Sequence, residues 1–122
     1  MESSKERNLF LGIDVGGTNI KVGLVDCGGV LIAKSSAATE PLRTPERVFR
    51  YAMDFANEHL TQAEVPGNIL AGVGLAVPGV LDSRECVLRE VVNLPGWLGQ
   101  PLRRILTDVA QRTATVVNDA NA

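Results

Sequence analysis

The sequence predicts a mixed α/β fold, in which an antiparallel meander of three strands leads into parallel strands joined by helices. Three short apolar segments in the first part of the chain are separated by glycine-containing turns, a pattern typical of antiparallel hairpins. Farther along, two segments of helical periodicity are each followed by a short apolar run. A helix between two strands favours a parallel pair, because it carries the chain back across the sheet. The predicted element order is therefore β-β-β-α-β-(hairpin)-α-β.

The meander consists of three predicted strands with two turns between them. The strands fall at residues 9–15, 20–25 and 30–34. Apolar residues alternate with others along the second strand, which indicates one buried face. The turns are Gly16-Gly17-Thr18-Asn19 and Asp26-Cys27-Gly28-Gly29. A polar loop is expected at residues 35–44.

Two helices and the remaining strands follow. Thr44 can cap a helix that begins at Pro45, since proline suits the first helical position. Apolar side chains recur every four residues from Val48 to Leu60, so this helix has one buried face. A second helix is predicted at residues 101–112. The remaining strands are predicted at 69–77, 80–82, 87–92 and 115–117, the middle two as a small hairpin.

Length and composition fit one domain. The chain has 122 residues, of which 45% are hydrophobic and 21% charged. Its net charge of -2 argues against a nucleic-acid partner, and no apolar run approaches the roughly 20 residues that span a membrane. The two cysteines, Cys27 and Cys86, form neither a disulfide framework nor a zinc-binding pattern. We therefore expect a cytoplasmic protein without a membrane partner.

Residues 1–8 are polar and charged, and we expect them to form a flexible lead-in before a domain at 9–122. The chain stops within a few residues of a predicted strand end. A domain boundary more often follows a polar linker, so we expect the parent protein to continue.

The strongest candidate site is the turn after the first strand. Asp14 precedes Gly16 and Gly17, and Thr18 and Lys21 follow them. Adjacent glycines let the backbone approach a bulky anion and point amide groups at it, and the threonine hydroxyl adds a donor. Asp14 can hold a magnesium ion directly or through water, because hard cations prefer oxygen ligands. Lys21 adds positive charge nearby.

An ordinary hairpin turn, with the glycines at positive φ, is the alternative for this segment. It is not a Walker A loop, because the G-x-x-x-x-G-K spacing is lacking in the sequence. It is not a dinucleotide-binding fingerprint either, because the glycines lead into a strand and not into a helix.

The stretch from Asp14 to Asp26, DVGGTNIKVGLVD, resembles the phosphate-binding hairpin of the actin, heat-shock chaperone and sugar-kinase superfamily. Within that superfamily it is similar to the ROK family of sugar kinases and repressors. The resemblance implies a ribonuclease H-like (actin-like ATPase) domain that uses ATP and magnesium. It also implies that the segment from Gly16 to Lys21 holds the phosphates, with Asp14 on the magnesium side.

Two further motifs follow in the family's order. Pro78-Gly79 ends a predicted buried strand, where bare backbone can approach a small ligand, and a simple strand-ending turn is the alternative. Asn93 opens the stretch N-L-P-G-W, and its amide suits sugar hydroxyls. Trp97 could stack on a sugar, but we expect it to pack the loop onto the core. The resemblance implies that Gly79 and Asn93 lie beside the sugar.

The last motif is Asn118-Asp119-Ala120-Asn121, directly after a predicted buried strand. A carboxylate flanked by amides favours a chemical role here, and a helix cap is an alternative that is compatible with it. In the ROK kinases that this segment resembles, the matching residues supply the general base and a sugar-binding asparagine. The resemblance therefore implies Asp119 as the catalytic base, in contact with the sugar, and Asn118 as a sugar ligand.

The reaction implied by the resemblance transfers the γ-phosphoryl group of ATP to a hexose, with glucose 6-phosphate formation in glycolysis as the leading expectation. Kinases of this family have a second lobe that completes the nucleotide pocket and carries a structural zinc motif. We expect this chain to be the N-terminal lobe of a protein that is commonly a homodimer. We expect no zinc site in this chain, and little activity from the lobe alone.

Three alternatives to a glucokinase stay open. A ROK-type repressor would place a helix-turn-helix domain before the phosphate-binding turn, but only 13 residues precede Asp14. A sugar-binding or regulatory domain without catalysis is a second alternative, against which the presence of Asp119 argues. The third is a kinase for another hexose, such as N-acetylmannosamine or fructose.

Overall fold

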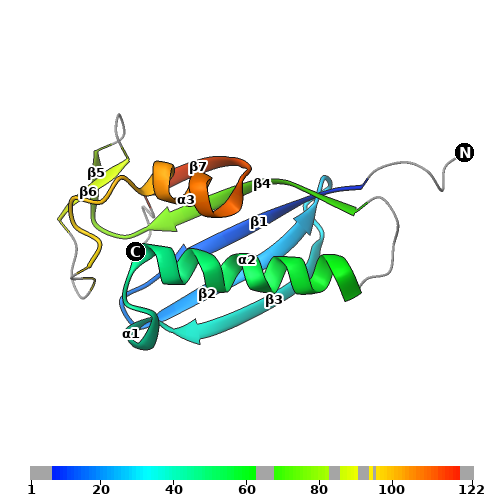
Figure 1. The fold of residues 1–122 in the computed structure, drawn as a ribbon, viewed down its shortest axis with the longest axis horizontal. Coiled ribbons are helices and arrows are strands. Elements are labelled where there is room, and N and C mark those ends of the chain that lie inside the picture. Colours follow the sequence, from blue (N-terminus) through cyan, green and yellow to red (C-terminus); the bar gives the residue numbers. More distant parts are fainter. Residues whose placement is uncertain (1–6, 63–67, 83–85, 91–93, 95, 119–122) are drawn as a thin grey trace, which may run out of the picture.

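The computed structural model describes residues 7–62, 68–82, 86–90, 94 and 96–118. Its main sheet contains β1 (Arg7–Val15), β2 (Asn19–Asp26), β3 (Leu31–Ala38), β4 (Asn68–Val77) and β7 (Thr113–Asn118). A separate hairpin is formed by β5 (Val80–Asp82) and β6 (Val87–Glu90). The helices are α1 (Thr39–Leu42), α2 (Pro45–Gln62) and α3 (Leu102–Ala110). Figure 1 shows the two longer helices, α2 and α3, side by side on one face of the main sheet.

The main sheet has the strand order β3-β2-β1-β4-β7. β2 is antiparallel to β1 and to β3, whereas β4 is parallel to β1 and β7 is parallel to β4. The predicted mixed sheet, with a meander followed by parallel strands, is therefore confirmed. Because β1, β4 and β7 run in one direction, their carboxyl ends meet at one edge of the sheet, which we call the carboxyl edge (Figure 1).

The hydrophobic core fills the space between the sheet and the helices α2 and α3. Alternate strand residues such as Leu11 and Leu75 face the helices and are buried. The predicted apolar face of α2 is confirmed: Val48, Ala52 and Ala56, spaced four residues apart, are fully buried, and Leu60 at the end of the row is partly buried. Thr44 caps this helix as predicted, because its Oγ1 accepts a hydrogen bond from the Arg47 amide at 3.3 Å.

The other face of the sheet carries small residues, with Gly12, Gly23 and Gly74 at its centre. No helix among the described residues packs on this face, and each of these glycines is partly or fully exposed. The sheet is therefore buried on one side only in the described part of the chain. None of the described helices is both long and apolar enough to cross a lipid bilayer.

The prediction of a polar loop at residues 35–44 is wrong. β3 extends to Ala38, and the short helix α1 follows it directly. The reason is that backbone pairing, and not hydrophobic alternation, continues the strand: β2 and β3 stay in register up to the pair Asn19↔Ala38. Polar and small residues occupy this part of β3 without disturbing the ladder.

Three smaller differences concern element ends. β1 begins at Arg7, inside the segment predicted as a lead-in. α3 ends at Ala110 and not at 112, because Gln111 adopts a left-handed φ of 56°, and β7 then begins at Thr113. The small hairpin is confirmed, with its second strand at Val87–Glu90. The last two residues predicted for that strand lie outside the described part of the chain.

Candidate functional site

The turn between β1 and β2 is closed by one backbone hydrogen bond. The Gly16 amide donates to the Asn19 carbonyl at 2.9 Å, so Gly17 and Thr18 form the tip. Neither Gly16 nor Gly17 is among the glycines with positive φ, so the alternative in which both serve to reach positive φ is wrong. Gly16 is needed for space instead, since a Cβ there would lie 3.0 Å from the Asn19 carbonyl oxygen. This turn therefore exposes bare backbone at its tip.

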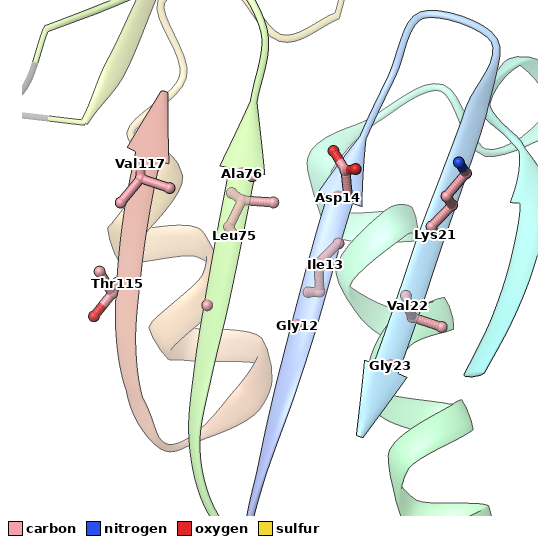
Figure 2. Close-up of a pocket in the computed structure, with 11 residues that line it drawn as sticks. Gly12, Ile13, Asp14, Lys21, Val22, Gly23, Leu75, Ala76, Thr115 and Val117 are labelled. Carbon is pink, nitrogen blue, oxygen red and sulfur yellow. The ribbon is translucent and has the colours of Figure 1, made fainter. Parts of the chain in front are cut away.

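Asp14 and Lys21 lie opposite each other on β1 and β2, two residues before the turn and two after it. Both side chains are exposed. Figure 2 shows them on neighbouring strands near the end where β1 turns into β2. The pair therefore places a carboxylate and an ammonium group beside the candidate phosphate-binding turn.

The same two side chains close one end of a groove of about 510 Å³ on the open face of the sheet (Figure 2). Glycine, valine and alanine line most of the groove, including Gly12, Gly74 and Ala76. Such a lining offers few partners for sugar hydroxyls or phosphate oxygens. The polar groups instead gather at the carboxyl edge, and we take that edge as the candidate site.

The ends of β4 and β7 bring two more predicted residues to this edge. β4 ends at Val77, which pairs with Asn118 at the end of β7. Gly79 follows directly, is exposed, and has a φ of 92°, a conformation that residues with side chains rarely adopt. Gly79 therefore lies two residues beyond Val77, whose cross-strand partner is Asn118.

Some predicted site residues lie outside the described part of the chain. These are Asn93, Asp119 and Asn121, and for Asn118 only the backbone is described. The structure thus brings the candidate phosphate-binding turn, Asp14, Lys21, Gly79 and the Asn118 backbone to the ends of neighbouring strands.

Trp97 is a core residue, as we expected. Its side chain is fully buried, and its ring packs edge-on against Phe49 with a centroid distance of 5.8 Å. The indole Nε1 donates a hydrogen bond to the Arg43 carbonyl at 3.0 Å. Stacking of this ring on a sugar is excluded in this conformation, because none of its surface is accessible.

The described residues of the carboxyl edge offer magnesium one carboxylate, which fits an ion that is shared with the substrate. Among the described residues, no group of three His, Cys, Asp or Glu side chains is placed to hold a metal. Asp14 offers one exposed carboxylate, and magnesium in phosphoryl-transfer sites commonly takes one or two carboxylates together with phosphate oxygens and water. The exposed carboxylate of Asp14 is therefore compatible with the magnesium role that the sequence predicts.

Sequence reasoning missed Thr39, which contacts the phosphate-binding turn. Its Oγ1 donates to the Gly16 carbonyl at 2.8 Å, and its amide donates to the Thr18 carbonyl at 2.8 Å. We had placed Thr39 in a polar loop. The available signal was Pro41, since proline is favoured in the first turn of a helix, and a helix start there would have ended the loop.

Comparison with known proteins gives one consistent answer. A family model described as the ROK family matches residues 10–122. The N-acetyl-D-glucosamine kinase of Pectobacterium atrosepticum is 32% identical over 93% of this chain, which spans 35% of that relative. The chain thus covers about a third of the length of such curated relatives.

Solved structures agree in fold. A ROK hexokinase from Thermus thermophilus matches 93% of this chain and 36% of its own with a TM-score of 0.72 and 37% identity. A ROK family glucokinase from Streptomyces griseus, in complex with glucose and AMPPNP, matches 93% of this chain and 34% of its own at 26% identity and a TM-score of 0.69. A ROK family transcriptional regulator shares the fold at 16% identity, with a TM-score of 0.67 and coverage of 92% and 28%. The chain has the actin-like ATPase fold, and it belongs to the ROK family.

Proposed function

We propose that this chain is the N-terminal lobe of an ATP-dependent hexose kinase that binds both substrates at the carboxyl edge. One observation carries the proposal: the β1–β2 turn follows β1, the Gly79 turn follows β4 and Asn118 ends β7, and these three strands are neighbours in the sheet. A phosphate donor and a sugar held there would lie side by side. Ligands in open α/β sheets bind beyond the carboxyl ends of the strands, which supports this placement.

The donor side is the β1–β2 turn. The backbone of Gly16, Gly17 and Thr18 would receive the phosphates of ATP, and Lys21 would balance part of their charge. Phosphoryl transfer depends on positioning and charge neutralisation more than on covalent chemistry. A magnesium ion bound with the ATP would supply further neutralisation, and Asp14 would hold it directly or through water.

The acceptor side is formed by the strand ends of β4 and β7. Gly79, Asn93 and Asn118 would orient the sugar so that its hydroxyl lies in line with the γ-phosphoryl group. Asp119 would accept the proton of that hydroxyl as the oxygen attacks phosphorus. General-base assistance of this kind contributes about 10²–10⁴ in rate.

We propose glucose as the sugar, phosphorylated at its 6-hydroxyl in a cytoplasmic, glycolytic step. The complex of the related Streptomyces griseus glucokinase with glucose supports a hexose in this kind of site. The relative from Pectobacterium atrosepticum is named for N-acetyl-D-glucosamine, so an N-acetylated hexose is the nearest competitor.

A sugar panel tests the proposal. ATP consumption by the complete two-lobed polypeptide is measured in a coupled assay with glucose, N-acetylglucosamine, N-acetylmannosamine or fructose, and without sugar as the control. We expect the highest kcat/KM with glucose. A higher kcat/KM for another hexose would correct the substrate assignment alone. If no hexose causes ATP consumption, the proposal of a kinase is contradicted.

A further inference from the structure

We propose that Thr39 is a positioning residue of the phosphate-binding turn, which it holds in the shape that presents the Gly17 amide to an anion. This inference rests on the proposed function, because that function assigns the turn its ligand. Thr39 lies at the start of α1, 23 residues after Gly16 in the sequence. Within the described part of the chain, Thr39 is the one polar or charged residue that is buried, with 3% of its surface exposed.

Two hydrogen bonds join Thr39 to the turn, one to Gly16 before the tip and one to Thr18 in the tip. The hydroxyl Oγ1 donates to the Gly16 carbonyl at 2.8 Å, and the backbone amide donates to the Thr18 carbonyl at 2.8 Å. The amide bond prolongs the β2–β3 ladder by one step beyond the pair Asn19↔Ala38. The hydroxyl bond is different, because it depends on the side chain and reaches across to the β1 side of the turn.

The direction of a held carbonyl fixes the direction of the next amide. In a planar trans peptide, the C=O and the N–H point in opposite directions. The Gly16 carbonyl points at Thr39, so the N–H of Gly17, which shares that peptide, points away from Thr39. The Gly16 amide is already used by Asn19. By holding the Gly16 carbonyl, the Thr39 hydroxyl therefore sets the direction of the Gly17 amide, which is the donor left for an anion.

Thr39 is itself held by the core. The Arg43 amide donates to the Thr39 carbonyl at 3.0 Å, which closes α1. The Arg43 carbonyl in turn accepts the hydrogen bond from the indole of Trp97, which is fully buried. A continuous series of hydrogen bonds thus runs from the core through α1 to the turn, and it gives Thr39 a fixed place from which to act.

The test compares three substitutions in the 122-residue chain with one control. Thr39→Val removes the hydroxyl at nearly constant volume, Thr39→Ala removes it without adding a methyl group near the Gly16 carbonyl, and Thr39→Ser keeps it. Ser35→Ala is the control, because it deletes a half-buried hydroxyl of β3 whose 2.9 Å hydrogen bond joins Tyr51 of α2 and not the turn.

Two readouts are taken by NMR. The order parameters of the Gly17 and Thr18 amides report whether the turn is rigid. Titration with inorganic tripolyphosphate and magnesium, followed at the Gly17 amide, reports anion binding. We expect both Thr39→Val and Thr39→Ala to lower the order parameters from about 0.85 towards 0.6. We expect them to weaken tripolyphosphate binding roughly five- to ten-fold, the effect of one lost neutral hydrogen bond.

Thr39→Ser and Ser35→Ala should keep both the order and the binding of the wild-type chain. If the turn stays as rigid without the hydroxyl, or binds tripolyphosphate equally well, the inference is overturned. If one apolar variant does not fold, the other provides the comparison. If the Gly17 amide of the wild-type chain does not respond to tripolyphosphate, the phosphate role that the proposed function gives to this turn is contradicted, and the order parameters alone then decide the inference about Thr39.

Discussion

At the scale of single residues, the room available for a Cβ atom decides at which positions glycine is required. A Cβ at Gly16 would lie 3.0 Å from the backbone oxygen of Asn19, which the hairpin holds in place. A Cβ at Gly74, on the open face of the sheet, would meet no atom within 4 Å. The two positions therefore form a matched pair, one beside the candidate phosphate site and one in the middle of a strand.

Gly16→Ala should open the turn and weaken ATP binding, while Gly74→Ala should not. We expect Gly16→Ala to destabilise the chain by about 1–3 kcal/mol, the usual cost of forcing extra volume into a packed position. Gly74→Ala should stay within about 0.5 kcal/mol of the wild type. Urea unfolding measures both, together with the KM for ATP of the complete kinase. Equal effects of the two substitutions would contradict the role of Gly16.

The turn between β1 and β2 could be predicted from the sequence because its residues are contiguous, and its phosphate role stays a proposal. Asp14, Gly16 and Lys21 all lie within a few positions of the tip. Thr39 could not be predicted in the same way. Its contact with Gly16 spans 23 residues and exists only because β3 pairs with β2 over its full length.

At the scale of elements, the loop around Trp97 and the short helix α1 stabilise each other. The indole ring fills the core beside Phe49, and its N–H satisfies the Arg43 carbonyl at the end of α1. Because α1 also begins at Thr39, the loop around Trp97 and the β1–β2 turn are supported by the same four-residue helix.

Trp97→Phe should cost about 1–3 kcal/mol of unfolding free energy, since it removes the indole donor of the hydrogen bond to the Arg43 carbonyl and leaves space in the core. Leu98→Ala, at a neighbouring position with 45% of its surface exposed, is the control and should cost less than about 0.5 kcal/mol. Chemical unfolding of the 122-residue chain gives both values. A stability for Trp97→Phe that matches the wild type would show that the indole N–H does not hold α1.

Hydrophobic patterning predicted most of the elements, and it failed where backbone pairing decides the structure. The buried row of α2 and its Thr44 cap could be predicted, because periodicity and capping are local properties. The end of β3 and the helix α1 could not, since Ser35 to Ala38 have no apolar alternation and take their conformation from β2. The end of α3 depends on the left-handed φ of Gln111, for which glycine would have been the ordinary signal.

At the scale of the whole molecule, the chain covers about a third of the length of its curated relatives. Its sheet is open on one face in the described part, and its candidate site lies at one edge. A site at an edge leaves the substrates accessible to water on the side away from the sheet. We therefore propose that a second lobe is needed to enclose them.

The isolated 122-residue chain should accordingly show little glucose phosphorylation. In the coupled assay we expect its kcat/KM for glucose to fall by at least about 10²-fold relative to the complete kinase, because a misplaced substrate loses the benefit of orientation. Circular dichroism confirms that the chain is folded in the same buffer. Turnover by the chain alone that is close to that of the complete kinase would contradict the need for a second lobe.

The most direct test of the account concerns Asp119, the carboxylate that we propose as the general base. Asp119→Asn is made in the complete kinase, with Asp108→Asn, an exposed carboxylate on α3, as the control. We predict that Asp119→Asn lowers kcat for glucose by about 10²–10⁴ with the KM for ATP and the unfolding curve unchanged, while the control keeps wild-type turnover. Wild-type turnover by a folded Asp119→Asn kinase would contradict the assignment of the base.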